Sequence, residues 1–200
     1  MLSKPKYKIC KRLGNGVYEK CQTQKFALSE ARVKKTFKRR RNLSDYGRQL
    51  LEKQKVRFAY GITEKQLRKY VTAAVRTKEP TLELFKGLET RLDNTIYRSG
   101  FAPTRRAARQ MVSHGHITIN GKKMTVPSHM LKTGDVLSVR DGSKDKPLFV
   151  LNMDTIAGHG APKWLTTDGK KLTSKVKAVP EFVASDTFFD LPAVFEFYSR

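Results

Sequence analysis

The sequence predicts an α+β protein, with helices through much of its first half and an antiparallel hairpin after them. Residues 44–113 repeat apolar side chains at helical spacing between capping residues and glycines. Residues 117–126 alternate around Asn120-Gly121, the dipeptide that favours a two-residue hairpin turn. Residues 1–42 mix glycine, proline and scattered charge with little apolar periodicity, which indicates an extended basic arm.

Two helices are expected immediately after this arm. Ser44 or Asp45 can cap the first helix, and Gly61 supplies its stop. Thr63 and Gln66 fit a capping box at the start of the second. Apolar side chains of the second helix recur at i, i+3, i+4 and i+7 and should pack inward: Leu67, Tyr70, Val71 and Ala74.

A further helical stretch is expected beyond the break at Pro80. Its leucines lie along one side, a kink is expected near Gly87, and Gly100 follows it. Thr104 then caps a short helix that ends at Gly115. The small and apolar side chains of this short helix should face a core: Ala107, Ala108, Met111 and Val112.

Strands are expected in most of the remaining chain. After the hairpin, Gly134-Asp135 turns the chain into a strand at 136–139, and residues 141–147 form a loop. Residues 148–151 are predicted to be a strand, and 164–179 a weaker strand region. A last helix is expected after the capping residue Asp190, with apolar side chains again at helical spacing.

The charge of the chain indicates an anionic partner. Lysine and arginine number 41 against 18 acidic residues, so the formal net charge is +23. A charge of this size repels itself in a compact state unless a partner offsets it. Residues 1–41 hold 14 basic and 2 acidic side chains, whereas residues 151–200 hold six of each. We therefore predict that nucleic acid binds the first three-quarters of the chain.

A membrane is the other large anionic surface, but the sequence disfavours it. No run of about 18 apolar residues occurs, and the basic stretches lack a broad apolar face. The first ten residues interleave charges with serine, proline and tyrosine, and no apolar segment of a secretory signal follows. We expect a cytoplasmic protein. Cys10 and Cys21 could form one disulfide, but we expect none because a cytosolic setting keeps thiols reduced.

The stretch from Arg91 to Val139 contains the residues that are most informative about binding. A helix, a tight turn and a hairpin would place cationic and polar side chains on one surface: Arg105, Arg106, Arg109, Gln110, Ser113, His114, His116 and Lys122. Guanidinium groups match phosphate oxygens with two parallel donors, and a helix start at Thr104 adds backbone N–H groups. Such a surface would recognise the shape, phosphates and 2′-hydroxyls of folded RNA. The alternative is that these arginines form a solvated helix face with no partner. The basic arm in the same chain favours RNA binding over this alternative.

The same stretch resembles a known family. Arg91-Leu92-Asp93-Asn94, Gly100-Phe101-Ala102, Ala108-Arg109-Gln110 and Val112-Ser113-His114-Gly115-His116-Ile117 are similar to the RNA-binding module of bacterial small-ribosomal-subunit protein four. The likeness extends to Tyr46-Gly47, Glu52-Lys53-Gln54-Lys55, Tyr60-Gly61 and the terminal Phe197-Tyr198-Ser199-Arg200. Nearly the whole chain is covered.

The resemblance implies a domain organisation. It implies a helical domain that is interrupted by a second domain, whose small antiparallel sheet carries the helix-plus-hairpin RNA-binding module. With the residue patterns, this predicts an extended basic arm at 1–42 and a helical domain at 43–90, completed by a C-terminal helix at about 185–200. An α+β domain at 91–184 would hold the module at about 91–150.

The resemblance also implies a function and partners. The chain is expected to be a structural constituent of the small ribosomal subunit and a primary binder of its 16S ribosomal RNA. It would bind a multi-helix junction in the 5′ domain early and nucleate assembly. Its neighbours would be small-subunit proteins three and five, with messenger RNA at the entry channel nearby, and it would contribute to decoding fidelity.

The residues expected to contact RNA fall into three groups. Those in the arm are Lys34, Lys35, Lys38, Arg39, Arg40 and Arg41. Those in the helical domain are Gln49, Lys53, Lys55, Arg57, Lys65 and Arg68. Those in the module are Arg91, Arg98, Thr104, Arg105, Arg106, Arg109, Gln110, Ser113, His114, His116, Asn120 and Lys122.

One departure from the family concerns zinc. Some members bind zinc near the N-terminus through four cysteines, and the corresponding positions here are Tyr7, Cys10, Cys21 and Phe26. Two thiolates cannot close a tetrahedral site, and tyrosine and phenylalanine are not zinc ligands. We expect no bound zinc and no other cofactor, with the two cysteines as remnants of a possible four-cysteine site.

An enzyme and a free binding factor are the alternatives. Similar modules are appended to RNA-modifying enzymes, but those chains add a catalytic domain, and no Gly-rich phosphate loop or Cys-His metal cluster occurs here. His114 and His116 stand two residues apart and are expected to hydrogen-bond backbone or RNA rather than to catalyse. A stress factor that rescues stalled large subunits would not need the helices before Pro80. We therefore expect a ribosomal protein and no enzymatic activity.

Overall fold

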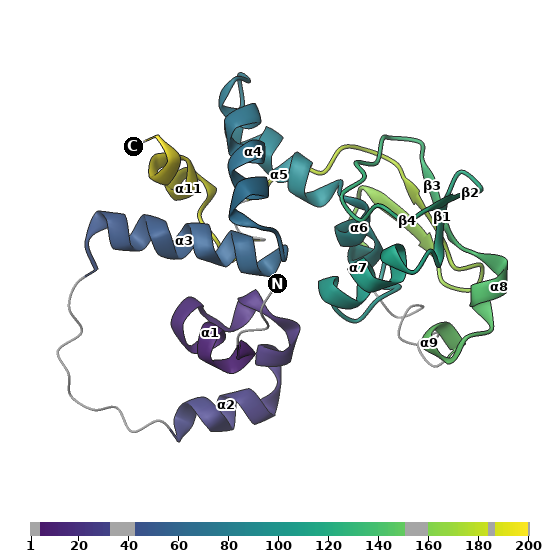
Figure 1. Cartoon of the computed structure of the whole chain (residues 1–200), viewed down its shortest axis with the longest axis horizontal. Helices are drawn as coiled ribbons and strands as arrows, with labels where there is room; N and C mark the ends of the chain where they lie inside the picture. Colours follow the sequence, from purple (N-terminus) through teal and green to yellow (C-terminus); the bar gives the residue numbers. More distant parts are fainter. Residues whose placement is uncertain (1–4, 33–42, 151–159, 184–186, 200) are drawn as a thin grey trace. The chain divides into compact units, whose positions relative to one another are not determined.

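The structure is a computed structural model that describes residues 5–32, 43–150, 160–183 and 187–199 (Figure 1). The chain forms two compact units. One contains Met1–Thr81 together with Val183–Arg200, and the other contains Leu82–Phe182. Within the described residues, no helix has the length and apolar character that a membrane span requires. The class is α+β, as predicted, with an antiparallel sheet of five strands.

The N-terminal residues fold, which corrects the prediction of an extended arm for 5–32. They form α1 (Lys6–Leu13), the 3₁₀ turns η1 (Asn15–Val17) and η2 (Glu19–Gln22), and α2 (Gln24–Ala31). Their own small core is made by five buried side chains: Cys10, Leu13, Val17, Cys21 and Phe26. The apolar residues belong to four short elements, so no long period could reveal them. Residues 33–42, the rest of the predicted arm, lie outside the described residues.

The two cysteines are paired, contrary to the prediction. Cys10 of α1 and Cys21 of η2 form a disulfide with their Cα atoms 6.4 Å apart. Tyr7 and Phe26, at the two other positions where family members carry zinc ligands, pack ring against ring at 5.3 Å. The chain between the cysteines turns back on itself and brings their side chains into one core. Disulfide-bonded cysteines offer no thiolate to a metal, and tyrosine and phenylalanine are not zinc ligands.

Reducing this disulfide is expected to loosen the N-terminal helices selectively. The bond closes a loop with a sequence separation of 11, and closure of a loop near that length contributes about 3 kcal/mol. Hydrogen exchange of α1 and α2 should therefore accelerate on addition of dithiothreitol, while exchange in the sheet-containing unit stays unchanged. A Cys10→Ser/Cys21→Ser variant is the control and should exchange fast with or without the reductant. Equal exchange of wild type in both conditions would contradict the expectation.

Three helices complete the first unit, and their caps were predicted correctly. Helix α3 (Asp45–Ala59) begins at Ser44, whose side chain accepts a hydrogen bond from the Gly47 N–H. Helix α4 (Glu64–Val75) begins with the capping box of Thr63 and Gln66. Helix α11 (Leu191–Tyr198) is capped by Asp190 and packs on α3 and α4. The predicted inward stripe of α4 is buried at Leu67, Val71 and Ala74 and half-buried at Tyr70.

The predicted helical stretch after Pro80 is two helices, and the interruption between them lies at Thr90 and Arg91, three residues beyond Gly87. Helix α5 (Pro80–Glu89) runs through Gly87, and α6 (Leu92–Arg98) begins after an interruption at Arg91. Arg91 has extended dihedral angles and forms an isolated bridge with Met130. The backbone N–H of Leu131 donates to the Thr90 carbonyl at 2.9 Å. This pairing with a distant segment breaks the helix, and no local signal announces it.

The helix and hairpin of the module match the prediction. Helix α7 (Arg105–Ser113) is capped by Thr104, whose side chain accepts from the Ala107 N–H, and Gly115 follows its end with φ of +71°. Strands β1 (Ile117–Ile119) and β2 (Lys122–Met124) pair antiparallel across Asn120-Gly121. Strand β3 (Val136–Val139) pairs with the other edge of β1.

The sheet has the order β2-β1-β3-β5-β4. Strands β4 (Leu165–Asp168) and β5 (Thr173–Val176) lie in the predicted weaker strand region. Figure 1 shows α6 and α7 lying against this sheet, and the side chains between them form one core that includes Leu92, Ile96 and Phe101. The structure thus holds α7 and the hairpin on a common core.

Two short helices replace a predicted loop and strand. Helix α8 (Asp141–Lys144) stands in the expected loop, and α9 (Pro147–Val150) stands where a strand was expected at 148–151, of which residue 151 lies outside the described residues. A four-residue apolar run does not distinguish a strand from a helix. Pro147 favours a helical first turn because its fixed φ suits that position.

Candidate nucleic-acid interface

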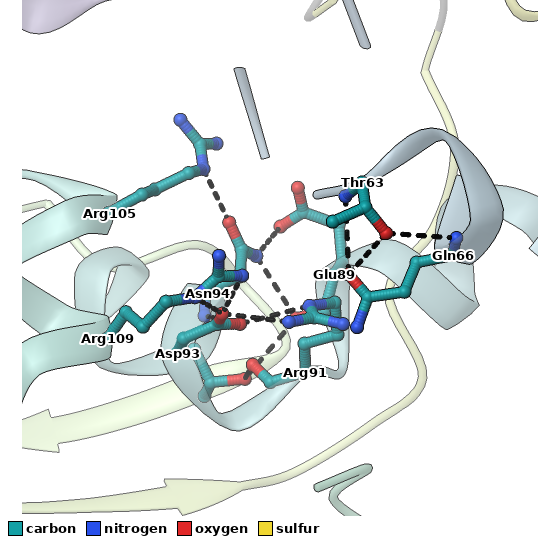
Figure 2. A network of polar contacts seen from close by, with 9 residues as sticks. Thr63, Gln66, Glu89, Arg91, Asp93, Asn94, Arg105 and Arg109 are labelled. Atoms are coloured by element: carbon teal, nitrogen blue, oxygen red, sulfur yellow. Dashed lines mark hydrogen bonds and ion pairs between the residues drawn. The ribbon is translucent and has the colours of Figure 1, made fainter. Parts of the chain in front are cut away.

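A buried ion-pair network joins α6 to α7. Arg91 is only 1% exposed and makes two contacts with Asp93, Nε to Oδ1 at 3.0 Å and Nη2 to Oδ2 at 2.8 Å. Arg109 of α7 reaches the same carboxylate, with Nη2 2.6 Å from Oδ2. Figure 2 shows Arg91 and Arg109 converging on Asp93 from the two elements. The position of Arg109 is thus set by an acid inside the core.

Glu89 and Asn94 extend this network to two more arginines. Arg98 makes paired contacts with the Glu89 carboxylate, Nε to Oε2 at 2.8 Å and Nη2 to Oε1 at 2.9 Å. Asn94 donates to Glu89 Oε2 at 3.0 Å and accepts from Arg105 Nε at 2.7 Å (Figure 2). The Arg105 guanidinium also lies 4.4 Å from the centre of the Tyr97 ring.

The network leaves an excess of positive charge at the surface. It contains the carboxylates of Asp93 and Glu89 and four guanidinium groups: Arg91, Arg98, Arg105 and Arg109. The side chains of Arg98 and Arg109 remain 35% and 33% exposed. A phosphate approaching them would meet arginines that are already ordered, so less conformational entropy would be lost on binding. Arg91 is buried and faces Asp93, so the predicted contact of Arg91 with RNA would require this ion pair to open.

The outer face of the module is polar and exposed. Arg106, Gln110, Ser113 and His114 are exposed on α7 or at its end, and Lys122 is exposed on β2. Most of the predicted set is therefore brought together on one helix and the hairpin that follows it. Thr104 serves the helix as its cap, so its hydroxyl already accepts from the Ala107 N–H at 3.1 Å.

Two predicted residues of the module have structural partners. Asn120 stands in the hairpin turn with φ of +50°, donates to Asp135 and accepts from the Val136 N–H, both at 2.9 Å. His116 is half-buried, with Nδ1 3.0 Å from the Ser143 hydroxyl. Burial, assisted by the charges of Lys146, His114 and Arg140, lowers the pKa of His116. This histidine is therefore held toward its neutral form, which does not attract phosphate.

A second cationic face lies on α4. Lys65, Arg68, Lys69 and Arg76 are exposed, and with Thr72 and Ala73 they line an open depression of about 510 Å³. No acidic residue lines it. The cations extend over about 16 Å of helix, at 1.5 Å per residue. We call this surface the α4 face.

Sequence reasoning missed half of the α4 face. Lys65 and Arg68 were predicted to contact RNA, whereas Lys69 and Arg76 were not. The signal was available, because a helix of 3.6 residues per turn brings residues 65, 69 and 76 to one side. The sequence also predicts the inward stripe of this helix, so the residues on the opposite face, and their charges, follow from the same spacing.

Two residues of α3 that were predicted to contact RNA are buried and have partners within the protein. Gln49 is buried and donates to Glu196 Oε2 of α11 at 2.8 Å. Lys53 is also buried, with its Nζ 3.0 Å from Glu64 Oε1 and 4.3 Å from the centre of the Phe197 ring. Both side chains point into the packing of α3 against α4 and α11, which the sequence around α3 does not reveal.

Glu64 takes part in several of these interactions. Burial alone would raise the pKa of Glu64, but hydrogen bonds from Tyr198 and Lys53 and the charges of Lys53 and Arg57 lower it overall. Burial and the hydrogen bond to this carboxylate, 2.6 Å long, raise the pKa of Tyr198. Arg57 Nη1 lies 3.4 Å from Glu64 Oε2, and Lys55 pairs with Glu52 at 2.6 Å.

The remaining residues predicted to contact RNA belong to the arm. The six arm residues from Lys34 to Arg41 lie outside the described residues.

Within the part of the chain that the structure describes, no group of three or more histidine, cysteine or acidic side chains could hold a metal ion. His114 and His116 stack edge to face, with ring centres 6.0 Å apart.

Comparisons with known proteins match the two regions separately. The family model described as "Ribosomal protein S4/S9 N-terminal domain" matches residues 1–89, which include the α4 face. The model described as "S4 domain" matches residues 90–137, which include the buried network, α7 and the hairpin.

Curated relatives are similar over most of the chain. "Small ribosomal subunit protein uS4" of Acetivibrio thermocellus is 41% identical over 199 residues, covering 96% of this chain and 96% of the relative. The proteins of the same name from Aquifex aeolicus and Chromobacterium violaceum are 43% and 45% identical, each covering 81% of this chain and 79% of the relative. The chain belongs to the ribosomal protein S4 family.

Proposed function

We propose that this chain is a primary binder of 16S ribosomal RNA that nucleates assembly of the small ribosomal subunit. The observation that carries the proposal is the 41% identity to a small-subunit protein over 96% of both chains. The family consists of structural ribosomal proteins, so the chain is a ribosomal protein that acts in the cytoplasm, within the ribosome, and is not an enzyme. What we infer beyond this is the order and place of its binding.

The charge distribution supports direct contact with RNA. Each unit carries exposed cations on a helix: the α4 face in one, and Arg106 with its partly exposed neighbours on α7 in the other. Both present charged side-chain nitrogens, which suit recognition of phosphates and of RNA shape. A protein that contacts two surfaces of a folded junction stabilises that fold by mass action. This is the property that a nucleating protein needs.

The finer parts of the proposal concern neighbours and accuracy. We infer that the chain sits beside small-subunit proteins three and five, near the messenger RNA entry channel, and contributes to decoding fidelity. The proposed RNA contacts are the exposed or partly exposed predicted cations and polar residues, together with Lys69 and Arg76. The six arm cations stay in the proposal, because segments of like charge commonly bind nucleic acid.

Replacing Arg105, Arg106 and Arg109 together by alanine should weaken binding to a 16S 5′-domain transcript and flatten its salt dependence. The slope of log K against log salt should fall by about 0.7–0.9 for each of these arginines that contacts a phosphate. Filter binding between 50 and 400 mM KCl measures it. Arg106→Ala alone is the matched variant for stability, because Arg106 is exposed and outside the buried network.

The outcomes separate the parts of the proposal. An unchanged slope in the triple variant would remove α7 from the interface. Equal affinity of the wild type for the 5′-domain transcript and for an unrelated folded RNA would overturn the primary-binder role. Sedimentation with small subunits in high salt distinguishes an integral protein, which stays bound, from a free factor, which washes off.

A further inference from the structure

A second cavity lies between α1 and α3, apart from the α4 face. It has a volume of about 400 Å³, within the range of small-molecule sites. One wall is apolar and consists of Ile9, Leu13 and Phe58. Both helices belong to the same unit and pack against each other, so the cavity is formed within one compact body.

Cations surround the mouth of this cavity. Lys8 and Arg12 stand four residues apart on α1, both exposed, and neither has a carboxylate partner among the described residues. Arg57 contributes a third cation from α3. Its acid, Glu64, also pairs with Lys53, so one negative charge is shared between two positive ones. No acidic residue lines the cavity.

The apolar wall distinguishes this cavity from a plain phosphate site. Ile9 and Phe58 are half-buried and pack against the N-terminal core, so their positions are held from behind. The Arg57 guanidinium lies 4.7 Å from the centre of the Phe58 ring, which places a planar cation beside an aromatic ring. Unstacked bases in RNA complexes lie on such aromatic and guanidinium planes. A free phosphate would use the cations and leave the apolar wall in water.

We propose that this cavity receives one unstacked nucleotide of RNA, with its base against Ile9 and Phe58 and its phosphate beside Lys8 and Arg12. The Gln54 side chain also lines the cavity, and an amide offers both a donor and an acceptor to a base edge. An acidic peptide would match the charges but would offer no planar group to the Phe58 ring. The inference rests on the proposed binding to ribosomal RNA and adds to it a defined subsite for a single base.

A photocrosslinking experiment with the full chain tests the subsite. The probe is a 12-nucleotide single-stranded RNA with one 4-thiouridine, and the crosslinked peptides are mapped by mass spectrometry. The expected result is a crosslink within residues 6–13 or 54–58. Phe58→Leu should reduce this crosslink about tenfold, because base stacking on the ring is lost. Phe58→Tyr keeps the ring and should retain the crosslink.

The cations are tested by a matched pair of variants. Lys8→Gln/Arg12→Gln and Lys25→Gln/Arg32→Gln each remove two exposed positive charges from the N-terminal helical region. The first should lose the crosslink and lower the salt slope by about 0.7, the value for one phosphate of a single strand. The second should retain the crosslink. An abasic probe of the same length should bind wild type and Phe58→Leu equally.

Three results would overturn the subsite: an absent crosslink in wild type, equal crosslinking by Phe58→Leu with its fold intact by circular dichroism, or equal loss in both charge variants. None of these concerns the 5′-domain transcript. If the wild type binds that transcript preferentially but the cavity variants crosslink as strongly as the wild type, the subsite fails and the proposed function stands. If the transcript is not preferred but the crosslink forms, the proposed function fails and the cavity remains a nucleotide site.

Discussion

Replacing Asp93 by asparagine is expected to destabilise the sheet-containing unit by about 3–5 kcal/mol, the usual cost of breaking a buried ion pair from one side. Asp93 is the carboxylate that faces Arg91, which is 1% exposed and cannot reach water. It also holds Arg109 of α7. Asparagine keeps the shape of the side chain but removes the charge, so both guanidinium groups lose their counterion. This is a large fraction of the stability of an ordinary domain.

Urea unfolding followed by Trp164 fluorescence measures the effect. Trp164 is the single tryptophan of the chain and is buried in the core of the same unit, so its signal reports the packing of that core. The matched control is Asp141→Asn, which removes a carboxylate that is 95% exposed and paired with Lys144. This control should leave the unfolding midpoint almost unchanged, because exposed pairs contribute little. Similar unfolding midpoints for both variants would refute the assignment of Asp93 as the central acid.

Neutralising the α4 face is expected to give the largest loss of RNA affinity. The variant Lys65→Gln/Arg68→Gln/Lys69→Gln/Arg76→Gln removes four exposed cations that line one depression without an acid among them. If each meets a phosphate, the salt slope falls by about 3–4 and affinity at 0.1 M salt drops on the order of 10²–10³-fold. Filter binding to the 5′-domain transcript at several salt concentrations measures both quantities.

A charge-matched variant shows whether position matters. Lys163→Gln/Lys170→Gln/Lys171→Gln/Lys177→Gln also removes four exposed lysines, from the part of the chain whose charges balance. It should lower affinity much less than the α4 variant. Equal losses would mean that only the total charge of +23 attracts RNA and that the α4 face is no specific contact. Stability should be unaffected in both variants, because none of the eight side chains is buried.

The sequence predicted the features whose causes lie within a few residues. Ser44, Thr63, Thr104 and Asp190 cap helices as expected, because each side chain accepts from the backbone N–H three residues ahead. Asn120-Gly121 makes the hairpin for a similar reason, since the turn depends on the two residues themselves. The charge distribution and the family motifs were likewise evident from the sequence alone.

Several of the failures involve partners far away in the sequence. Gln49 is buried because it meets Glu196, and the helix after Pro80 breaks because residues near Met130 pair with Thr90 and Arg91. The N-terminal residues fold because short elements surround a common core, which has no period along the chain. No local pattern contains these contacts.

The sequence by itself determined the α+β class, the caps of α3, α4, α7 and α11, the hairpin and the cationic character that points to RNA. Only the tertiary structure decided which cations remain at the surface. It withdrew Arg91 and Lys53 into ion pairs and ordered Arg109 on Asp93. The physical reason is that caps and turns are short-range interactions, whereas the burial and pairing of a charge depend on whatever the folded chain brings against it.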